Sequence, residues 1–313
     1  MRTLITGGAG LLGSVLGPYL QERGHAVTLL DCRPCISVCP SVLADVQDGE
    51  TLLRAIDGHN TVIHAAALHG VHVNSSPTSD FVSVNVLGTH NVLEASRVTG
   101  VKRVLLASST SVYGVSRTKE RQAAVIVNEE TPLLPADLND LCKVLSEHLC
   151  SFYARQYGLS CIALRFGRFS RDDWVASNLY KLFGGADVMD IAQAAFLAAE
   201  ATALEDDVFC ISARTRFTAE DAPRLIGQAD TVIEQHYPGT RKLFEMHGIQ
   251  LPRVIHRIVD IRRAESQLKY APQRNFEEFL QELAERAGKS GNRGPRRHFA
   301  DAAYHRGTSQ ISN

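Results

Sequence analysis

The sequence predicts an α/β fold, with a doubly wound parallel sheet and a small C-terminal lobe. Three observations carry this prediction. Short apolar runs rich in β-branched residues alternate with helical patterns, the runs are continuous rather than alternating in polarity, and four glycines in seven residues follow the first run. The chain has 313 residues, 44% of them hydrophobic and 21% charged, which suits one large domain or two modest ones.

The predicted main domain spans residues 1–165. Its first strands are Arg2–Thr6 and Ala26–Asp31, and the segment between them has apolar residues at helical spacing. Further strands are predicted at Thr61–Ala66, Arg103–Ser108 and Ser160–Phe166, with helices at Val84–Thr99 and Asn139–Tyr157. Continuous apolar strands of this kind belong to a parallel sheet that is buried on both faces.

Beyond residue 165 the pattern is less regular, and residues 166–287 are predicted to form the small substrate-binding lobe. Within it, residues 187–212 are expected to fold back onto the main sheet. The elements expected there are a helix at Asp187–Ala203, a strand at Val208–Ser212, and helices at Phe217–Ala229 and Phe276–Ala287. Residues 288–313 carry five cations against Asp301 alone and are glycine-rich, so a disordered basic tail is predicted.

Charge and cysteine content exclude several classes of protein. The chain has 33 Lys and Arg against 34 Asp and Glu, so no basic excess attracts nucleic acid. No apolar run reaches the ~18 residues of a membrane span, and no signal segment is evident, so a cytoplasmic protein is predicted. Seven cysteines suit free thiols in a reducing compartment. Cys32, Cys35 and Cys39 have spacing that can hold metal or a disulfide, but without a fourth ligand nearby we predict no metal.

A glycine-rich turn predicts a dinucleotide site, which makes residues 1–165 a dinucleotide-binding domain. Gly7, Gly10 and Gly13 lie where the first strand ends and the first helix begins, with Leu11 and Leu12 opening that helix. Such glycines allow a tight turn, close approach of the backbone to a pyrophosphate and close helix–strand packing. The helix N-terminus then faces the phosphate charge.

The end of the second predicted strand indicates which dinucleotide binds. Asp31 can accept hydrogen bonds from the adenosine ribose hydroxyls, and its charge would repel a 2′-phosphate. Arg33 lies two residues later and would partly offset that repulsion, so NAD is favoured over NADP without excluding it. Asp45 and Val46, after a short apolar run, suit the adenine edge.

With these residues placed, the chain resembles the extended short-chain dehydrogenase/reductases over about residues 1–287, and in particular the NAD-dependent epimerase/dehydratase family. The resemblance implies a Rossmann-type sheet and cofactor contacts from the segment around Ala65, Ala66 and Ala67 and from Asn85. Its marks include the glycines, Asp31, Asp45-Val46, His64 to Ala67, Asn85, Ser108 to Gly114, Leu164-Arg165-Phe166 and Asp190-Ile191-Ala192.

The resemblance breaks at one catalytic position. Family members place a tyrosine four residues before a lysine, and the tyrosine exchanges the proton of the substrate hydroxyl. Here Lys143 is the lysine, whereas the position four residues earlier is Asn139, whose amide has no titratable proton near neutral pH. Ser109 aligns with the family's active-site serine, and Lys143 would still contact the nicotinamide ribose.

Three alternatives follow from Asn139. Another group moves the proton, the reaction does not need this transfer, or the protein does not catalyse redox chemistry. Candidate carriers are Asp140, Tyr113, Cys142 and the histidines at the end of the third main strand and in the loop after it, His64, His69 and His72. We expect His69 or His72 to serve.

The lobe predicts a substrate smaller than a nucleotide sugar. Only 24 residues separate Arg165 from Asp190, where nucleotide-sugar members of the family usually have a longer excursion. The residues there that can bind a polar or anionic ligand are Arg168, Arg171, Trp174, Asn178, Tyr180 and Lys181.

Two functions are therefore carried forward. The first is an NAD-dependent epimerase, dehydratase or dehydrogenase acting on a sugar-like or other small hydroxylated metabolite. The alternative is an NAD-binding sensor or partner protein without redox catalysis. A homodimer is also predicted, because the helices at Val84–Thr99 and Asn139–Tyr157 have apolar residues on more than one face, and family members commonly pair through these helices.

Overall fold

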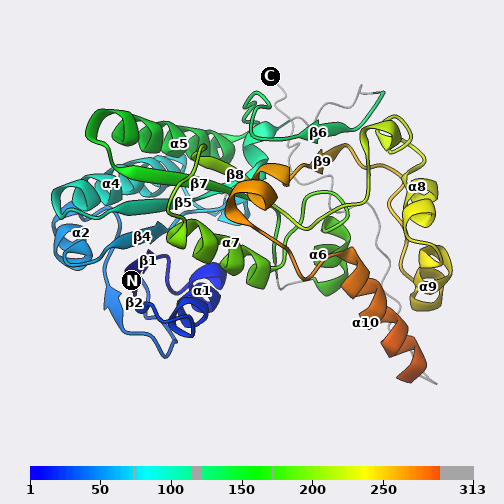
Figure 1. The fold of residues 1–313 in the computed structure, drawn as a ribbon, viewed down its shortest axis with the longest axis horizontal. Helices are drawn as coiled ribbons and strands as arrows, with labels where there is room; N and C mark the ends of the chain where they lie inside the picture. Colours follow the sequence, from blue (N-terminus) through cyan, green and yellow to red (C-terminus); the bar gives the residue numbers. More distant parts are fainter. Residues whose placement is uncertain (73–74, 115–121, 171–172, 290–313) are drawn as a thin grey trace.

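The described residues of the computed structural model, 1–72, 75–114, 122–170 and 173–289, form a seven-stranded parallel sheet (Figure 1). The strand order is β3-β2-β1-β4-β5-β7-β8. The chain adds β2 and β3 on one side of β1 and then crosses to add β4 and the later strands on the other side, so the switch point lies between β1 and β4. This confirms the predicted doubly wound fold. The strands are β1 (Arg2–Thr6), β2 (Ala26–Asp31), β3 (Ser41–Leu43), β4 (Thr61–His64), β5 (Arg103–Ser109), β7 (Ser160–Phe166) and β8 (Val208–Ile211).

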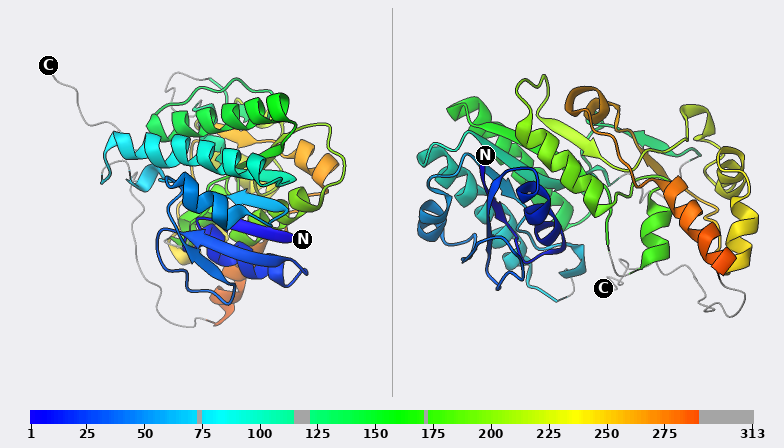
Figure 2. Two further views of the ribbon diagram at one scale, coloured as in Figure 1. Left: turned by 90° about the vertical axis from the view of Figure 1, so that its left-hand side faces the viewer. Right: turned by 60° about the horizontal axis from the view of Figure 1, so that its bottom comes forward.

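Helices cover both faces of the sheet (Figure 2). Leu4, Val62 and Leu106 point into a core shared with α2, α4 and α5, whereas their strand neighbours point into the core shared with α1 and α7. The double burial explains why the strands read as continuous apolar runs. The helices are α1 (Leu11–Gln21), α2 (Gly49–Ile56), α4 (Gly88–Val98), α5 (Leu138–Tyr157) and α7 (Val188–Glu200), with α3 (Thr78–Phe81) and the π-helical turn Val82–Leu87 leading into α4.

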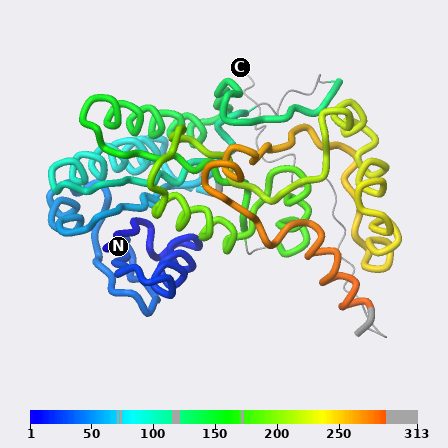
Figure 3. Tube along the Cα trace, viewed as in Figure 1, coloured from blue at the N-terminus to red at the C-terminus, as the bar shows by residue number. Residues whose placement is uncertain are grey.

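A smaller lobe lies beyond the carboxyl ends of the strands (Figures 1 and 2). Its core gathers Phe244, Phe276 and Phe279, and a separate parallel pair, β6 (Val125–Val127) with β9 (Arg257–Val259), joins it to the main domain. Figure 3 shows these two distant segments side by side. The lobe helices are α6 (Trp174–Tyr180), α8 (Ala229–His236), α9 (Thr240–His247) and α10 (Phe276–Lys289).

The helix predicted at Phe217–Ala229 is wrong. This segment contains only the 3₁₀ turn Ala219–Asp221, and α8 begins at Ala229, where the prediction ended. Pro223 has no N–H group to donate, and Gly227 has a φ of +96°, so a helix cannot run through both positions. The predicted basic tail lies outside the described residues from position 290 onward, as does Arg171.

All seven cysteines are free thiols. Within the described ranges, no three His, Cys, Asp or Glu side chains gather as metal ligands. No helix in the described part of the chain has both the length and the apolar character needed to cross a bilayer.

Candidate dinucleotide and substrate site

The glycine turn between β1 and α1 leaves the start of α1 open to a ligand. Gly10 is the N-cap of α1 and supplies no side-chain cap, so the first N–H groups of the helix remain for a bound anion. A Cβ atom at Gly13 would lie 2.4 Å from the Gly7 carbonyl oxygen, so only glycine permits this close packing. These features fit the pyrophosphate of a dinucleotide.

Asp31, at the end of β2, is a buried carboxylate that spans the turn. Its Oδ2 accepts a hydrogen bond from the Ala9 N–H at 3.0 Å, and its Oδ1 accepts one from the Arg33 N–H at 2.9 Å. The Arg33 Nε lies 3.5 Å from Asp31 Oδ1, but the arginine side chain is 69% exposed. Asp31 is therefore fixed in place, while Arg33 can move toward solvent.

The residues predicted at the adenine edge follow β3. The Asp45 carboxylate accepts a hydrogen bond from the Gln47 N–H at 2.9 Å, which fixes the turn. Val46 is buried and packs against Gly88, where a Cβ atom would approach Val46 Cγ2 to 2.7 Å. The turn after β3 is thus held against the start of α4.

The loop after β4 is held by hydrogen bonds to two side chains, those of Thr6 and Asn85. The Ala66 N–H donates to Thr6 Oγ1 at 3.2 Å, with Ala65 before it and Ala67 after it in the same loop. The amide of Asn85 accepts from the Leu68 N–H at 2.8 Å and donates to the Leu68 carbonyl at 3.0 Å. The side-chain oxygen and nitrogen of Asn85 both form hydrogen bonds, so this residue holds the loop after β4 in place.

The three histidines occupy two environments. His64 is buried in β4 between the hydroxyls of Thr6 and Thr89, at 2.7 and 3.1 Å, and burial lowers its pKa to about 3. His64 is therefore a structural residue. His69 and His72 lie on the loop after β4. There the backbone N–H of His69 donates to His72 Nδ1 at 2.9 Å, and the two rings stack with centroids 6.1 Å apart.

His69 lies within the electrostatic reach of Lys143. His69 is exposed to solvent on one side, but desolvation by the protein around it lowers its pKa to about 4, and the positive charges of Lys143 and His72 act in the same direction. His69 is consequently neutral near pH 7, with a ring nitrogen able to accept a proton.

Lys143 and Asn139 lie one turn apart on α5. Lys143 is buried, and its Nζ donates to the Ala107 carbonyl of β5 at 2.7 Å. Burial lowers its pKa to about 8. Asn139 Nδ2 donates to Asp140 at 3.4 Å, whereas its buried Oδ1 has no hydrogen-bond partner among the described residues. An acceptor without a donor thus lies one turn from the lysine.

Ser109 ends β5 and starts the 3₁₀ turn Thr110–Tyr113. Its Oγ accepts from the Ser111 N–H at 3.1 Å. The turn closes at Gly114, where φ is +54° and a Cβ atom would lie 1.8 Å from the Leu134 carbonyl oxygen, so the glycine is obligatory. This geometry explains the Ser-to-Gly motif and fixes Ser109 at the carboxyl edge of the sheet.

A buried polar network lies beneath this edge, and sequence reasoning missed most of it. Glu147 accepts from Ser108 Oγ at 2.5 Å and forms an ion pair with Arg165 at 2.8 Å. Arg165 also donates to Tyr113 Oη at 2.8 Å, and Tyr113 contacts Cys210 Sγ at 3.0 Å. The one sequence signal for the pair was Glu147 lying four residues after Lys143.

This network and its surroundings remove three of the candidate proton carriers. Tyr113 is fully buried, and desolvation raises its pKa far above the usual range. Cys142 is buried against the Phe81 carbonyl, and desolvation raises its pKa too. Asp140 is buried and accepts from the Ala136 N–H at 3.3 Å at the start of α5. His69 and His72 remain.

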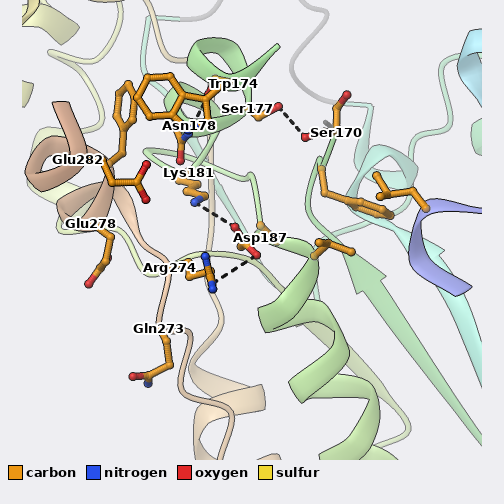
Figure 4. A pocket seen from close by; sticks show the side chains of 15 residues that line it. Ser170, Trp174, Ser177, Asn178, Lys181, Asp187, Gln273, Arg274, Glu278 and Glu282 are labelled. Carbon is orange, nitrogen blue, oxygen red and sulfur yellow. Dashed lines mark hydrogen bonds and ion pairs between the residues drawn. The ribbon is translucent and has the colours of Figure 1, made fainter. Parts of the chain in front are cut away.

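A pocket of about 600 Å³ lies between the first turn of α1 and the lobe (Figure 4). Leu11 of α1 and Phe169, after β7, line one side, while α6, α10, the start of α7 and the segment before α10 supply most of the rest. Of the residues predicted to bind substrate, Trp174, Asn178 and Lys181 line it, whereas Arg168 stacks on Tyr180 at 4.6 Å. Ser109, Asn139 and Lys143 are not among its lining residues.

Comparison with known sequences yields one family match. The family model described as NAD dependent epimerase/dehydratase matches residues 3–170. The chain is 31% identical over 170 residues to a uronate dehydrogenase of Pseudomonas syringae pv. tomato, covering 53% of this chain and 58% of that protein. It is 29% identical over 191 residues to GDP-mannose 3,5-epimerase 1 of Oryza sativa subsp. japonica, covering 59% and 48%. The chain thus spans about half the length of these curated relatives.

A further relative and two solved structures extend the comparison. An L-arabinose 1-dehydrogenase (NAD(P)(+)) of Haloferax volcanii is 32% identical over 188 residues, covering 57% of this chain and 71% of that protein. A short-chain dehydrogenase/reductase superfamily protein of Agrobacterium tumefaciens, solved with bound NAD, has a TM-score of 0.71 at 20% identity, covering 92% and 97% of the two chains. The Thermotoga maritima UDP-glucose 4-epimerase with UDP-glucose has a TM-score of 0.67 at 23% identity, covering 92% and 99%. At these identities the structures establish the fold.

Proposed function

The chain belongs to the NAD-dependent epimerase/dehydratase family, and from this premise we propose that it is an NAD-dependent epimerase, dehydratase or dehydrogenase of a sugar-like or other small hydroxylated metabolite. One observation carries the proposal. The uncapped start of α1 and the fixed carboxylate of Asp31 lie at the same carboxyl edge of the sheet as Ser109 and Lys143. A dinucleotide bound along that edge would reach from the first pair of features to the second.

The cofactor is proposed to be NAD rather than NADP. Asp31 would accept hydrogen bonds from the ribose hydroxyls, while Gly7, Gly10, Leu11, Leu12 and Gly13 would surround the pyrophosphate at the start of α1. Asp45 and Val46 would border the adenine, and Lys143 would donate to the nicotinamide ribose. When bound, NAD supplies the acceptor for a hydride from the substrate.

We assign the proton transfer to His69, because Asn139 stands where the family's tyrosine is expected. Ser109 would hydrogen-bond the reacting oxygen, and the neutral ring of His69 would take the hydroxyl proton as the carbon loses its hydride. His72 would position the loop by accepting from the His69 N–H. The unpartnered Oδ1 of Asn139 would accept a hydrogen bond from the substrate.

The test compares turnover, followed by NADH absorbance and by chromatography of the product, in the unmutated protein and in the His69→Ala, His72→Ala and Asn139→Tyr variants. We expect either alanine substitution to lower activity at least tenfold, within the range of a positioned acid–base group. Asn139→Tyr should also lower it, because the ring crowds the substrate. A rise with Asn139→Tyr, together with no loss in either alanine variant, would show that the assignment to histidine is wrong.

The pH profile gives a second readout of the same assignment. The base form of His69 is lost as pH falls through about 4, and the ammonium of Lys143 is lost as pH rises through about 8. We therefore expect kcat/KM, which reports the free enzyme, to be flat between these values. His69→Ala should remove the acid limb and leave the alkaline one. An acid limb unchanged in this variant would contradict the role of His69.

A second candidate function is an NAD-binding sensor or partner protein without redox catalysis. The observation that favours it is Asn139, because an amide cannot exchange a proton and the loss of a positioned acid–base group costs roughly 10²–10⁴ in rate. The two functions differ in what they consume. A sensor would bind NAD and convert none of a panel of hydroxylated substrates. The enzyme would convert at least one of them, with net NADH formation if it is a dehydrogenase and with product but no net NADH if it is an epimerase or dehydratase.

We further propose that two copies pair through α4 and α5. The outer face of α5 exposes Leu141, Leu145 and Phe152, one and then two helical turns apart, and Val98 is exposed at the end of the neighbouring α4. Apolar side chains that no element of the same chain covers are typical of an interface. A two-fold axis along these helices would bury them against their copies.

A further inference from the structure

In the pocket between α1 and the lobe, the positive side chains are paired with an acid, whereas a site for anions would leave them available to the ligand. We propose that it binds an uncharged, polyhydroxylated ligand of monosaccharide size, without phosphate or carboxylate. This inference rests on the proposed function, because the pocket adjoins the proposed pyrophosphate site at Leu11, and it names the class of ligand that would bind there. It is argued from the side chains that line the pocket (Figure 4).

Two cations of the described pocket wall, Lys181 and Arg274, share one carboxylate. Lys181 Nζ lies 3.5 Å from Asp187 Oδ2, and Arg274 Nε lies 3.8 Å from Asp187 Oδ1. Figure 4 shows Asp187 between them. Among the described residues that line the pocket, the remaining charged ones are Glu278 and Glu282, so two cations face three acids there. An anionic ligand would compete with Asp187 for its partners and would be repelled by it.

Asp187 is held in this position by the fold. It is the N-cap of α7, and its Oδ1 accepts from the Met189 N–H at 2.9 Å. One turn later, buried Asp190 accepts from the N–H groups of Gln273 and Arg274 at 2.9 and 3.0 Å. The same first turn of α7 thus carries the neutralising carboxylate and draws the segment with Arg274 against it. The carboxylate that neutralises the two cations is therefore also the side chain that caps α7.

The rest of the wall suits hydroxyl groups. A hydroxyl both donates and accepts, and the Lys181–Asp187 pair offers a donor beside an acceptor. The amide of Gln273 adds another of each, while Trp174 and Phe279, with ring centroids 5.0 Å apart, form an apolar side. A volume of about 600 Å³ lies within the roughly 300–1,000 Å³ of small-molecule sites. Leu11, at the start of α1, places the pocket beside the proposed pyrophosphate site.

The test uses Asp187→Asn in the full chain saturated with NAD. Asn is as good an N-cap as Asp, so the variant keeps α7 while it releases Lys181 and Arg274. Asp173→Asn is the matched control, because Asp173 caps α6 in the same way, at 2.9 Å from the Ala176 N–H, and is exposed outside the lining. Calorimetry would measure the binding of D-galactose, D-glucose and L-arabinose, of glucuronate and of UDP-glucose.

We expect the unmutated protein and Asp173→Asn to bind at least one neutral sugar tenfold tighter than glucuronate or UDP-glucose. In Asp187→Asn the affinity for the two anions should rise at least tenfold. An anion that binds the unmutated protein tighter than every neutral sugar would overturn the inference. So would a protein that binds NAD but none of the sugars. A separate NAD titration distinguishes the two proposals, because loss of NAD binding itself would overturn the proposed function instead.

Discussion

The two ends of the proposed cofactor site are built in different ways. At the adenosine end, Asp31 meets Ala9 across the glycine turn and Arg33 two residues later, and the arginine is largely exposed. At the reacting end, Glu147, Arg165 and Tyr113 are buried and come from three distant segments. The comparison teaches that cofactor recognition rests on a short local motif, whereas the reacting geometry depends on the packing of the whole domain.

The strongest test of this comparison removes the buried ion pair. Glu147→Ala would leave the Arg165 charge unpaired and should lower the free energy of unfolding by about 3–5 kcal/mol. Urea denaturation would measure it, with Glu50→Ala as control, because the Glu50–Arg54 pair at 3.9 Å is exposed and should contribute less than about 1 kcal/mol. Equal losses in the two variants would show that the reacting end is no more dependent on packing than the surface.

A second test concerns α5, which carries Lys143 on its inner face and Phe152 on its outer face. Phe152→Glu should weaken the proposed dimer about a hundredfold, close to 2.7 kcal/mol, as a hot-spot residue does. Met246→Glu, at an exposed position on α9, should leave assembly unchanged. Sedimentation that finds only monomer in the unmutated protein at micromolar concentration would contradict the pairing.

The smallest expected effect lies at the adenosine end. We expect NAD to bind at least tenfold tighter than NADP, a difference of about 1.4 kcal/mol. Asp31→Ala should narrow this preference, because the repulsion of a 2′-phosphate is lost, without lowering the stability of the reacting end. Calorimetric titration with both dinucleotides would measure it. Equal affinities for NAD and NADP in the unmutated protein would show that Asp31 does not select NAD.

The sequence predicted the main sheet closely, because its strands are continuous apolar runs with glycine or charged boundaries. β1, β2 and β7 begin and end at the predicted residues, and β4 ends two residues earlier than expected. The short elements of the lobe were not predicted. β6 and β9 have three residues each and are defined only by pairing with each other, which no local pattern reveals.

The candidate site also has parts that the sequence could predict and parts that only the tertiary structure revealed. The glycine turn and Asp31 could be proposed from the sequence because the role proposed for them depends on spacing along the chain. His64 and Tyr113 looked like candidate proton carriers from their positions, but only the tertiary structure places them in buried networks. The shared use of Asp187 by Lys181 and Arg274 was likewise invisible, because Arg274 lies far along the chain from the other two residues.

The parallel pair β6–β9 has a consequence for how the chain matures. Arg257, at the start of β9, donates to the Thr110 carbonyl at 2.8 Å across 147 positions, in the turn next to Ser109. On the ribosome, the glycine turn and most of the sheet emerge long before this arginine does. Contacts this distant in sequence form late. The turn next to Ser109 therefore lacks this support until late in synthesis, and the geometry proposed for the reacting end depends on a residue that is made near the end of the chain.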